Sequence, residues 1–229
     1  MHAFDFEIIW RTAPYLFMTG MVFTLKLTVL STIGALILGT LLAMMRLSSN
    51  KIVSGVAGGY VNLLRALPLI LIIFWFYFLV PYIVGWVMQA GRPISVGGFT
   101  SALITFTLFE AAYFCEIMRA GIQSISRGQM GAGYALGLNY WQVMGSIVLP
   151  QAFRNMMPVL LTQMIVLFQD TSLVYVLSLT DFLGAASNVA QRDGRLVEMF
   201  IFAALVYFLI SYVASRTVKT LERRMAIVR

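Results

Sequence analysis

The sequence predicts an all-α integral membrane protein with about five transmembrane helices, and two observations support that fold class. Of the 229 residues, 60% are hydrophobic and only 11% are charged, whereas ordinary soluble domains carry about 25% charged residues. The charges are also absent from long apolar runs, and a helix needs roughly 20 largely apolar residues to cross a bilayer. These charge-free runs are 27–45, 66–91, 93–109, 155–169 and 199–215.

Extended into their flanking residues, the runs predict five spans in a single domain that covers residues 1–229. The runs are apolar on all sides, which disfavours amphipathic helices lying on a membrane surface. The first two spans are long enough to tilt or to extend beyond the bilayer, and Asp170 interrupts the fourth. The predicted helices are about 15–45, 62–88, 98–120, 150–178 and 197–219.

The distribution of Lys and Arg predicts the orientation, because cytoplasmic loops of membrane proteins carry an excess of both. Loops 46–65 and 119–154 and the tail after residue 215 hold most of the basic residues, and acidic residues dilute the rest. We therefore expect the N-terminus outside and the C-terminus in the cytoplasm. The net charge of +7 suits anionic lipid headgroups. The sequence has no basic stripe with interleaved aromatic residues in a soluble segment, so it does not indicate a nucleic-acid partner.

The chain lacks the residues needed for catalysis, for a metal site or for a nucleotide. A phosphate-binding P-loop requires adjacent Gly and Lys, and this pair does not occur. With one His and one Cys, His2 and Cys115, neither a metal cluster nor a nucleophile–base pair is expected. We predict no catalytic residue, no metal ligand and no cofactor in this chain, so that any energy source belongs to a partner.

Residues 128–154 form a glycine-rich loop between the third and fourth spans, on the predicted cytoplasmic side. Apolar residues spaced i, i+4, i+8 and i+11 predict one face of a helix over about 129–141. Three glycines make this helix marginal unless a partner orders it. The face carries Met130, Tyr134, Leu138 and Trp141. The loop is either a docking surface for a soluble protein or a connector whose apolar face touches lipid.

Pro150 is expected at the entry to the fourth span, since proline is favoured where the first helical amides are unpaired. The candidate docking residues are Gln129, Met130, Gly131, Ala132, Gly133, Tyr134, Gly137, Leu138, Trp141 and Pro150.

The loop resembles the EAA motif of ABC-importer permeases, in which Glu-Ala-Ala and a later Gly precede Ile-x-Leu-Pro. The matching residues are Gly131-Ala132-Gly133, Gly137 and Ile147-Val148-Leu149-Pro150. Gly131 stands where the motif has Glu, so a carboxylate near the helix N-terminus, worth about 0.3–1 kcal/mol, is missing. The coupling contact would then be weaker or depend more on Tyr134 and Trp141, and the alternative is a subunit that does not couple.

Other segments resemble the polar amino-acid permeases, and the resemblance covers essentially the whole chain. The segments are RALPL (65–69), EIMRAG (116–121) and DTSL (170–173). Similarity to bacterial glutamate/aspartate importer permeases extends through RLSS (46–49), FWFY (74–77), FEAAY (109–113), RAGIQSISRGQ (119–129), LFQDTSLVYVLSL (167–179) and RDG (192–194).

The resemblance implies a type I ABC-importer permease, a multi-pass protein of the bacterial inner membrane. Two permease subunits, usually different chains, would form the pathway above an ATPase dimer that binds ATP and Mg. A periplasmic binding protein would deliver the amino acid, and the loop would be the coupling helix in an ATPase cleft. Alternatives are a permease for another polar amino acid such as glutamine, a membrane scaffold, and a small secondary transporter, which the missing inverted repeat disfavours.

Polar residues inside the spans are candidates for the translocation pathway, because burial in hydrocarbon is costly. Each has a structural alternative: a hydrogen bond for Glu110, an ion pair with Arg119 for Glu116, a helix cap for Asp170 and a lipid or ATPase contact for Arg154. The candidates are Glu110, Glu116, Arg154, Gln163, Gln169, Asp170, Thr171 and Ser172.

Overall fold

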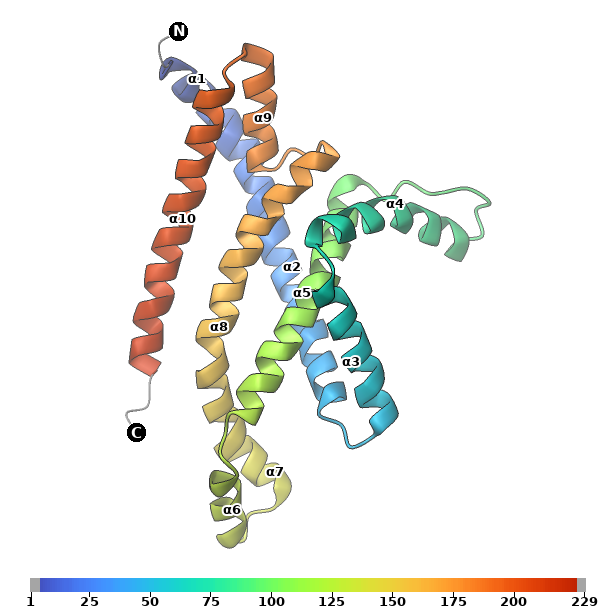
Figure 1. Cartoon of the computed structure of the whole chain (residues 1–229), viewed down its shortest axis with the longest axis vertical. Helices are drawn as coiled ribbons and strands as arrows, with labels where there is room; N and C mark the ends of the chain where they lie inside the picture. The colour runs from blue at the N-terminus through green and yellow to red at the C-terminus, as the bar shows by residue number, and fades with distance from the viewer. Residues whose placement is uncertain (1–4, 226–229) are drawn as a thin grey trace.

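The structure, a computed structural model, describes residues 5–225, and every regular element in that range is helical (Figure 1). Five helical segments are long and apolar enough to cross a membrane, which confirms the predicted number of spans. They are Glu7–Arg46, Leu69–Val87, Gly98–Gln123, Tyr140–Leu177 and Leu196–Met225. Residues 1–4 and 226–229, which include both termini, lie outside the described part of the chain.

The first span consists of α1 (Glu7–Tyr15), a π-helical segment (Leu16–Met21) and α2 (Val22–Arg46). It begins earlier than the predicted residue 15, because the polar first turns of α1 are helical as well. Pro14 lies inside α1 and offers no N–H for the regular ladder. The wider turns of the π-helical segment follow directly after this proline, in keeping with proline as a cause of helix irregularity.

The predicted helix over about 62–88 is wrong at its start, because the chain breaks there into two helices. These are α3 (Lys51–Ala66) and α4 (Leu69–Val87). Leu67 is extended, with φ −103° and ψ 142°, as expected for a residue that precedes a proline. The apolar run crosses Pro68 without interruption, so composition alone did not reveal the break. In Figure 1, α3 lies beside α2, whereas α4 runs to one side.

The main packing contact joins α2 to α5 (Gly98–Gln123), and small residues allow the two helices to approach closely. A Cβ atom added at Gly34 would lie 2.7 Å from Thr107 Cγ2, and one at Gly39 would lie 2.8 Å from Phe114 Cβ. Gly34 lies next to Thr107 and Gly39 lies next to Phe114, so residue numbers increase in the same direction along both helices and α2 and α5 run parallel. Small residues at such contacts are typical of membrane helix pairs.

The fourth span contains α8 (Leu149–Asp170), whose helix type changes at Asp170 to a 3₁₀ segment (Thr171–Leu177). The predicted interruption at Asp170 is confirmed. Residues 179–196 were left outside the predicted spans 150–178 and 197–219, yet they contain the buried helix α9 (Phe182–Asp193), which is followed by α10 (Leu196–Met225). Its buried face is made mainly of small residues, including Gly184, Ala185, Ala186 and Ala190, which a hydropathy pattern does not single out.

Candidate functional site

The loop between the third and fourth spans folds into two short helices, α6 (Arg127–Ala135) and α7 (Tyr140–Val143). The predicted single helix over about 129–141 is therefore wrong. Gly137 separates the two with a φ of 78°, a left-handed conformation that suits glycine and commonly follows a helix end.

Asn139 starts α7 with a capping box, the reciprocal arrangement that satisfies helix-start amides. Its Oδ1 accepts from Gln142 N at 3.0 Å, and Gln142 Oε1 accepts from Asn139 N at 2.9 Å. The new helix begins in a different direction, so residues on either side of Gly137 do not continue one helical face.

The four residues predicted to share that face divide into two pairs. Met130 and Leu138 pack inward on a small core made of Ile125, Val143, Val148 and Ala152. Tyr134 and Trp141 are exposed, at 45% and 80%. Two further apolar side chains lie exposed nearby, and we call the four together the α6–α7 surface. It consists of Tyr134, Leu136, Tyr140 and Trp141.

The remaining docking candidates are small or polar. Gln129, Gly131, Ala132 and Gly137 are exposed, and a Cβ atom added at Gly131 would meet open space within the described part of the chain. Gly133 is buried, where an added Cβ would lie 2.7 Å from Ile147 Cδ1. Because Gly133 has no side chain, α6 can pack closely against Ile147.

Pro150 is the second residue of α8, as predicted for the start of that helix, although the helical segment as a whole already begins at Tyr140. A π-helical segment (Met144–Val148) precedes it. Proline cannot donate a backbone hydrogen bond. The missing N–H of Pro150 therefore accounts for the wider turns that precede it.

Glu110 is fully buried in α5 and connects that helix to α8. Gln163 Nε2 donates to Glu110 Oε2 at 3.1 Å. The other carboxyl oxygen, Oε1, has no hydrogen-bond partner among residues 5–225. The expected structural hydrogen bond is present, and it satisfies only half of the carboxyl group.

Glu116 lies near the end of α5 and is contacted by three arginines. The predicted i, i+3 ion pair with Arg119 is confirmed, with Nη2 2.7 Å from Oε2. Arg46 at the end of α2 donates to Oε1. Arg65 at the end of α3 approaches Oε2 at 3.9 Å and lies over the ring of Tyr113, 5.3 Å from its centroid. The last two contacts come from other helices, so local spacing did not predict them.

The other pathway candidates of α8 do not converge on one point. Arg154 is exposed. Gln169 Nε2 donates to Ser211 Oγ at 3.0 Å, which connects α8 to α10. At the start of the 3₁₀ segment Asp170 makes no side-chain cap hydrogen bond to the described residues, so the cap interpretation is wrong. Thr171 is buried, with Oγ1 donating to Phe168 O at 2.7 Å, and Ser172 is half-buried.

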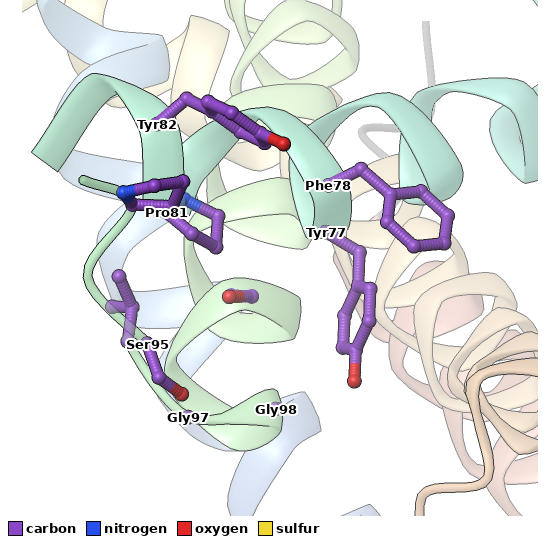
Figure 2. Close-up of a pocket in the computed structure, with 10 residues that line it drawn as sticks. Tyr77, Phe78, Pro81, Tyr82, Ser95, Gly97 and Gly98 are labelled. Carbon is purple, nitrogen blue, oxygen red and sulfur yellow. The ribbon is translucent and has the colours of Figure 1, made fainter. Parts of the chain in front are cut away.

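A cavity of about 320 Å³ lies at the opposite end of α5, next to α4. Figure 2 shows Tyr77, Phe78 and Tyr82 on α4, and Ser95 and Gly97 on the other side of the opening. None of the described residues that line this cavity is charged. It therefore offers no ionic contact to a charged solute.

Comparison with known proteins decides the family. The model of the family described as "Binding-protein-dependent transport system inner membrane component" matches residues 35–227. This chain belongs to that family. It is thus a membrane subunit of an ABC transporter in the inner membrane, and it works with an ATPase and a solute-binding protein rather than hydrolysing ATP itself.

Relatives and solved structures agree with this assignment over nearly the whole chain. The chain is 52% identical, over 99% of its length and 100% of the relative, to the glutamate/aspartate import permease protein GltK of Escherichia coli O6:H1. It is 32% identical, over 98% of its length and 99% of the relative, to the glutamine transport system permease protein GlnP of Escherichia coli K12.

Among solved structures, a chain from the "crystal structure of an amino acid ABC transporter with histidines" aligns with a TM-score of 0.86 and 30% identity. This alignment covers 98% of the present chain and 100% of the other. The MetNI methionine ABC transporter in an inward-facing conformation aligns with a TM-score of 0.76 and 17% identity, covering 93% and 97%. The second likeness shows the shared fold alone. Together the two establish the ABC-importer permease fold.

Proposed function

We propose that this chain is a permease subunit of an ATP-driven importer that carries glutamate and aspartate across the inner membrane. The observation that supports this most strongly is its 52% identity with a glutamate/aspartate import permease over 99% of the chain. A periplasmic binding protein delivers the amino acid, and the partner ATPase subunits bind ATP and Mg. Catalytic residues are therefore not expected in this chain.

The α6–α7 surface is the proposed docking site for the ATPase dimer, within a single permease domain whose coupling loop spans about 128–150. Two features support docking over a passive connector. The rings of Tyr140 and Trp141 are 5.3 Å apart in a T-shaped arrangement, and Trp141 is 80% exposed. Large aromatic side chains of this kind dominate the energetics of protein interfaces. The open space at Gly131 admits close approach of a partner backbone.

The proposed orientation has the N-terminus outside and the C-terminus in the cytoplasm. The positive-inside rule supports it, since Arg46 and Arg65 contact Glu116 near the end of α5 that leads into α6. In Figure 1, α1 and α9 lie at the opposite end. A fusion reporter at each terminus tests the orientation, and activity of a cytoplasmic reporter at the N-terminus would contradict it.

The proposed pathway runs along α5 and α8. Glu110 and Gln163 are its first candidates. A carboxyl group with only one satisfied oxygen inside a span is costly, and such groups usually serve a function. Glu116, Arg154, Gln169, Asp170, Thr171 and Ser172 remain candidates on the same two helices and the 3₁₀ segment. The pathway is completed by a second permease subunit, which we propose to be a different chain.

Reconstitution of the complete transporter in liposomes tests the function. We expect glutamate and aspartate, delivered by the binding protein, to stimulate ATP hydrolysis and to be taken up only when ATP is present. Uptake driven by an ion gradient without ATP would instead assign the chain to secondary transport. Preferential uptake of glutamine would move it to the class of its 32%-identical relative.

A double variant tests the docking surface separately. Tyr134→Ala with Trp141→Ala should reduce uptake at least about tenfold, since truncating an interface hot spot costs about 2 kcal/mol or more. The membrane body should remain folded, because both side chains are exposed. Trp86→Ala, an equally exposed tryptophan on α4, is the matched control. Unchanged uptake in the double variant would refute docking at this surface.

A further inference from the structure

A cavity of about 430 Å³ opens beside Glu116 on the seam between α5 and α8. Its polar wall brings together Arg65 of α3, Glu116 of α5, Ser124 just after α5, and Asn155 of α8. Asn155 Nδ2 donates to Ser124 Oγ at 2.8 Å. Ile117, Met156 and Val159 supply the apolar part of the lining. This mixture of an apolar wall and a few placed polar groups is typical of small-molecule sites, whose volumes begin near 300 Å³.

The charge beside this cavity is not balanced. Arg46, Arg65 and Arg119 contact the single carboxylate of Glu116, which leaves a local surplus of positive charge. Arg65 has the longest of the three contacts, at 3.9 Å, and its side chain is 42% exposed. A guanidinium group has five N–H donors in a planar fork suited to carboxylates. Arg65 is therefore the arginine with the most capacity to receive another anion.

The position of the cavity relates it to the proposed pathway. Asn155 and Val159 precede Gln163 on α8 by two turns and one turn, and Gln163 is hydrogen-bonded to Glu110. Polar groups thus recur along one seam, from the buried pair to the cavity. Charged and amide groups at partly exposed positions of a span belong beside water or a polar solute rather than beside lipid tails.

We propose that this cavity is the cytoplasmic exit subsite for the transported amino acid, with Arg65 receiving the side-chain carboxylate. The guanidinium exchanges its distant contact with Glu116 for the carboxylate of the ligand, and Glu116 supplies negative charge for the α-ammonium group. A ligand of net charge −1 matches the surplus positive charge of the site. The inference rests on the proposed function, because the acidic substrate supplies this carboxylate.

The single cysteine of the chain makes a direct test possible. Cys115→Ala removes the only native thiol, and Ala120→Cys places a new one at an exposed position in the cavity wall, one turn after Glu116. In the complete transporter in phosphatidylcholine nanodiscs, we measure modification of this chain by mass spectrometry. The probes are sulfonatoethyl and trimethylammonioethyl methanethiosulfonate, of similar size and opposite charge, with rates normalised to a free thiol.

The anionic reagent should react about tenfold faster than the cationic one, since a site of one sign of charge raises the local concentration of its counter-ion. Arg65→Gln should remove most of this preference. Lys51→Gln, at the exposed far end of α3, should retain it. Millimolar glutamate or aspartate should slow modification several-fold in the parent and not in Arg65→Gln, whereas glutamine should have no effect.

Absence of the charge preference, or equal protection by glutamine, would overturn the exit subsite. Protection that appears only when phosphatidylglycerol replaces phosphatidylcholine would also overturn it, by assigning the cavity to a lipid headgroup. Uptake measured on the same variants separates this inference from the proposed function. A transporter that imports glutamate without the charge preference refutes the subsite alone, and one with the preference that imports only another amino acid refutes the proposed substrate.

Discussion

Two glutamates of α5, six residues apart, have opposite surroundings. Glu110 is buried, accepts one hydrogen bond from Gln163, and has one oxygen without a partner among residues 5–225. Glu116 is partly exposed and contacted by three arginines from three helices. The same residue type on the same helix is thus held by cations near the helix end and by a neutral amide farther inside.

The difference shows how a membrane helix can hold carboxyl groups at two depths. Near the end of a span, long arginine side chains from neighbouring helices reach a carboxylate while remaining in contact with water. Deeper in the span, a charged partner would itself need compensation, and a neutral amide avoids that cost. The number and charge of the partners should therefore determine what each variant costs.

The largest effect is expected from Glu116→Gln. Three guanidinium groups lose their shared carboxylate while remaining close together, and removing one partner of such a network costs about 3 kcal/mol. The thermal unfolding midpoint of the purified complex, followed by tryptophan fluorescence, should fall clearly. Glu222→Gln, exposed on α10, should leave it nearly unchanged. Equal midpoints for the two variants would show that the arginines do not depend on Glu116.

Gln163→Leu should follow, at about 1–2 kcal/mol, because it leaves a buried carboxyl group without its donor. The same measurement applies, with Gln151→Leu as the control on α8, since Gln151 donates to the carbonyl of Ile147 within the same helix. In a Glu110→Leu background the cost of Gln163→Leu should shrink, as replacing both members of a buried pair is often nearly neutral. An unchanged cost would mean that Gln163 stabilises the fold through other contacts.

Glu110→Gln should have a smaller effect, below about 1 kcal/mol, because the carbonyl oxygen of an amide of the same size can still accept the hydrogen bond from Gln163. Unfolding of the complex measures it alongside Glu116→Gln. A loss as large as that of Glu116→Gln would contradict the contrast drawn between the two glutamates.

Arg65→Gln should be the mildest change in stability, within about 0.5 kcal/mol, since a long and half-exposed ion pair contributes little. Arg119→Gln, whose ion pair with Glu116 is 2.7 Å long, is the informative comparison and should cost more. If the two variants have the same unfolding midpoint, the length and exposure of the ion pairs do not determine how much each arginine contributes to stability.

Hydropathy predicted the five spans because crossing a bilayer requires continuous apolar length, and Gly98–Gln123 begins at the predicted residue 98 and extends only a few residues past its predicted end. The break at Leu67 was missed because Pro68 lies inside one uninterrupted apolar run. Helix α9 was missed because its sequence is polar overall, and its burial depends on small residues that fit against the first span.

The candidate site divides in the same way between local and tertiary information. The Glu116–Arg119 pair follows from spacing along one helix and was predicted. Arg46 and Arg65 are 70 and 51 positions away in the sequence, so only the fold brings them to Glu116. Tyr134 and Trp141 were predicted to lie on the exposed face, but the turn at Gly137 packs Met130 and Leu138 inward against a small core instead.

The contact between α2 and α5 bears on how the transporter changes conformation. At Gly34 and Gly39 there is no room for a single additional carbon atom, so sliding one helix along the other would drive side chains into the opposing backbone. The first and third spans are therefore expected to move as one rigid body, so that any displacement of α5 is carried directly to α2. Changes of conformation are then expected at breaks between helices, such as the extended Leu67 that precedes Pro68.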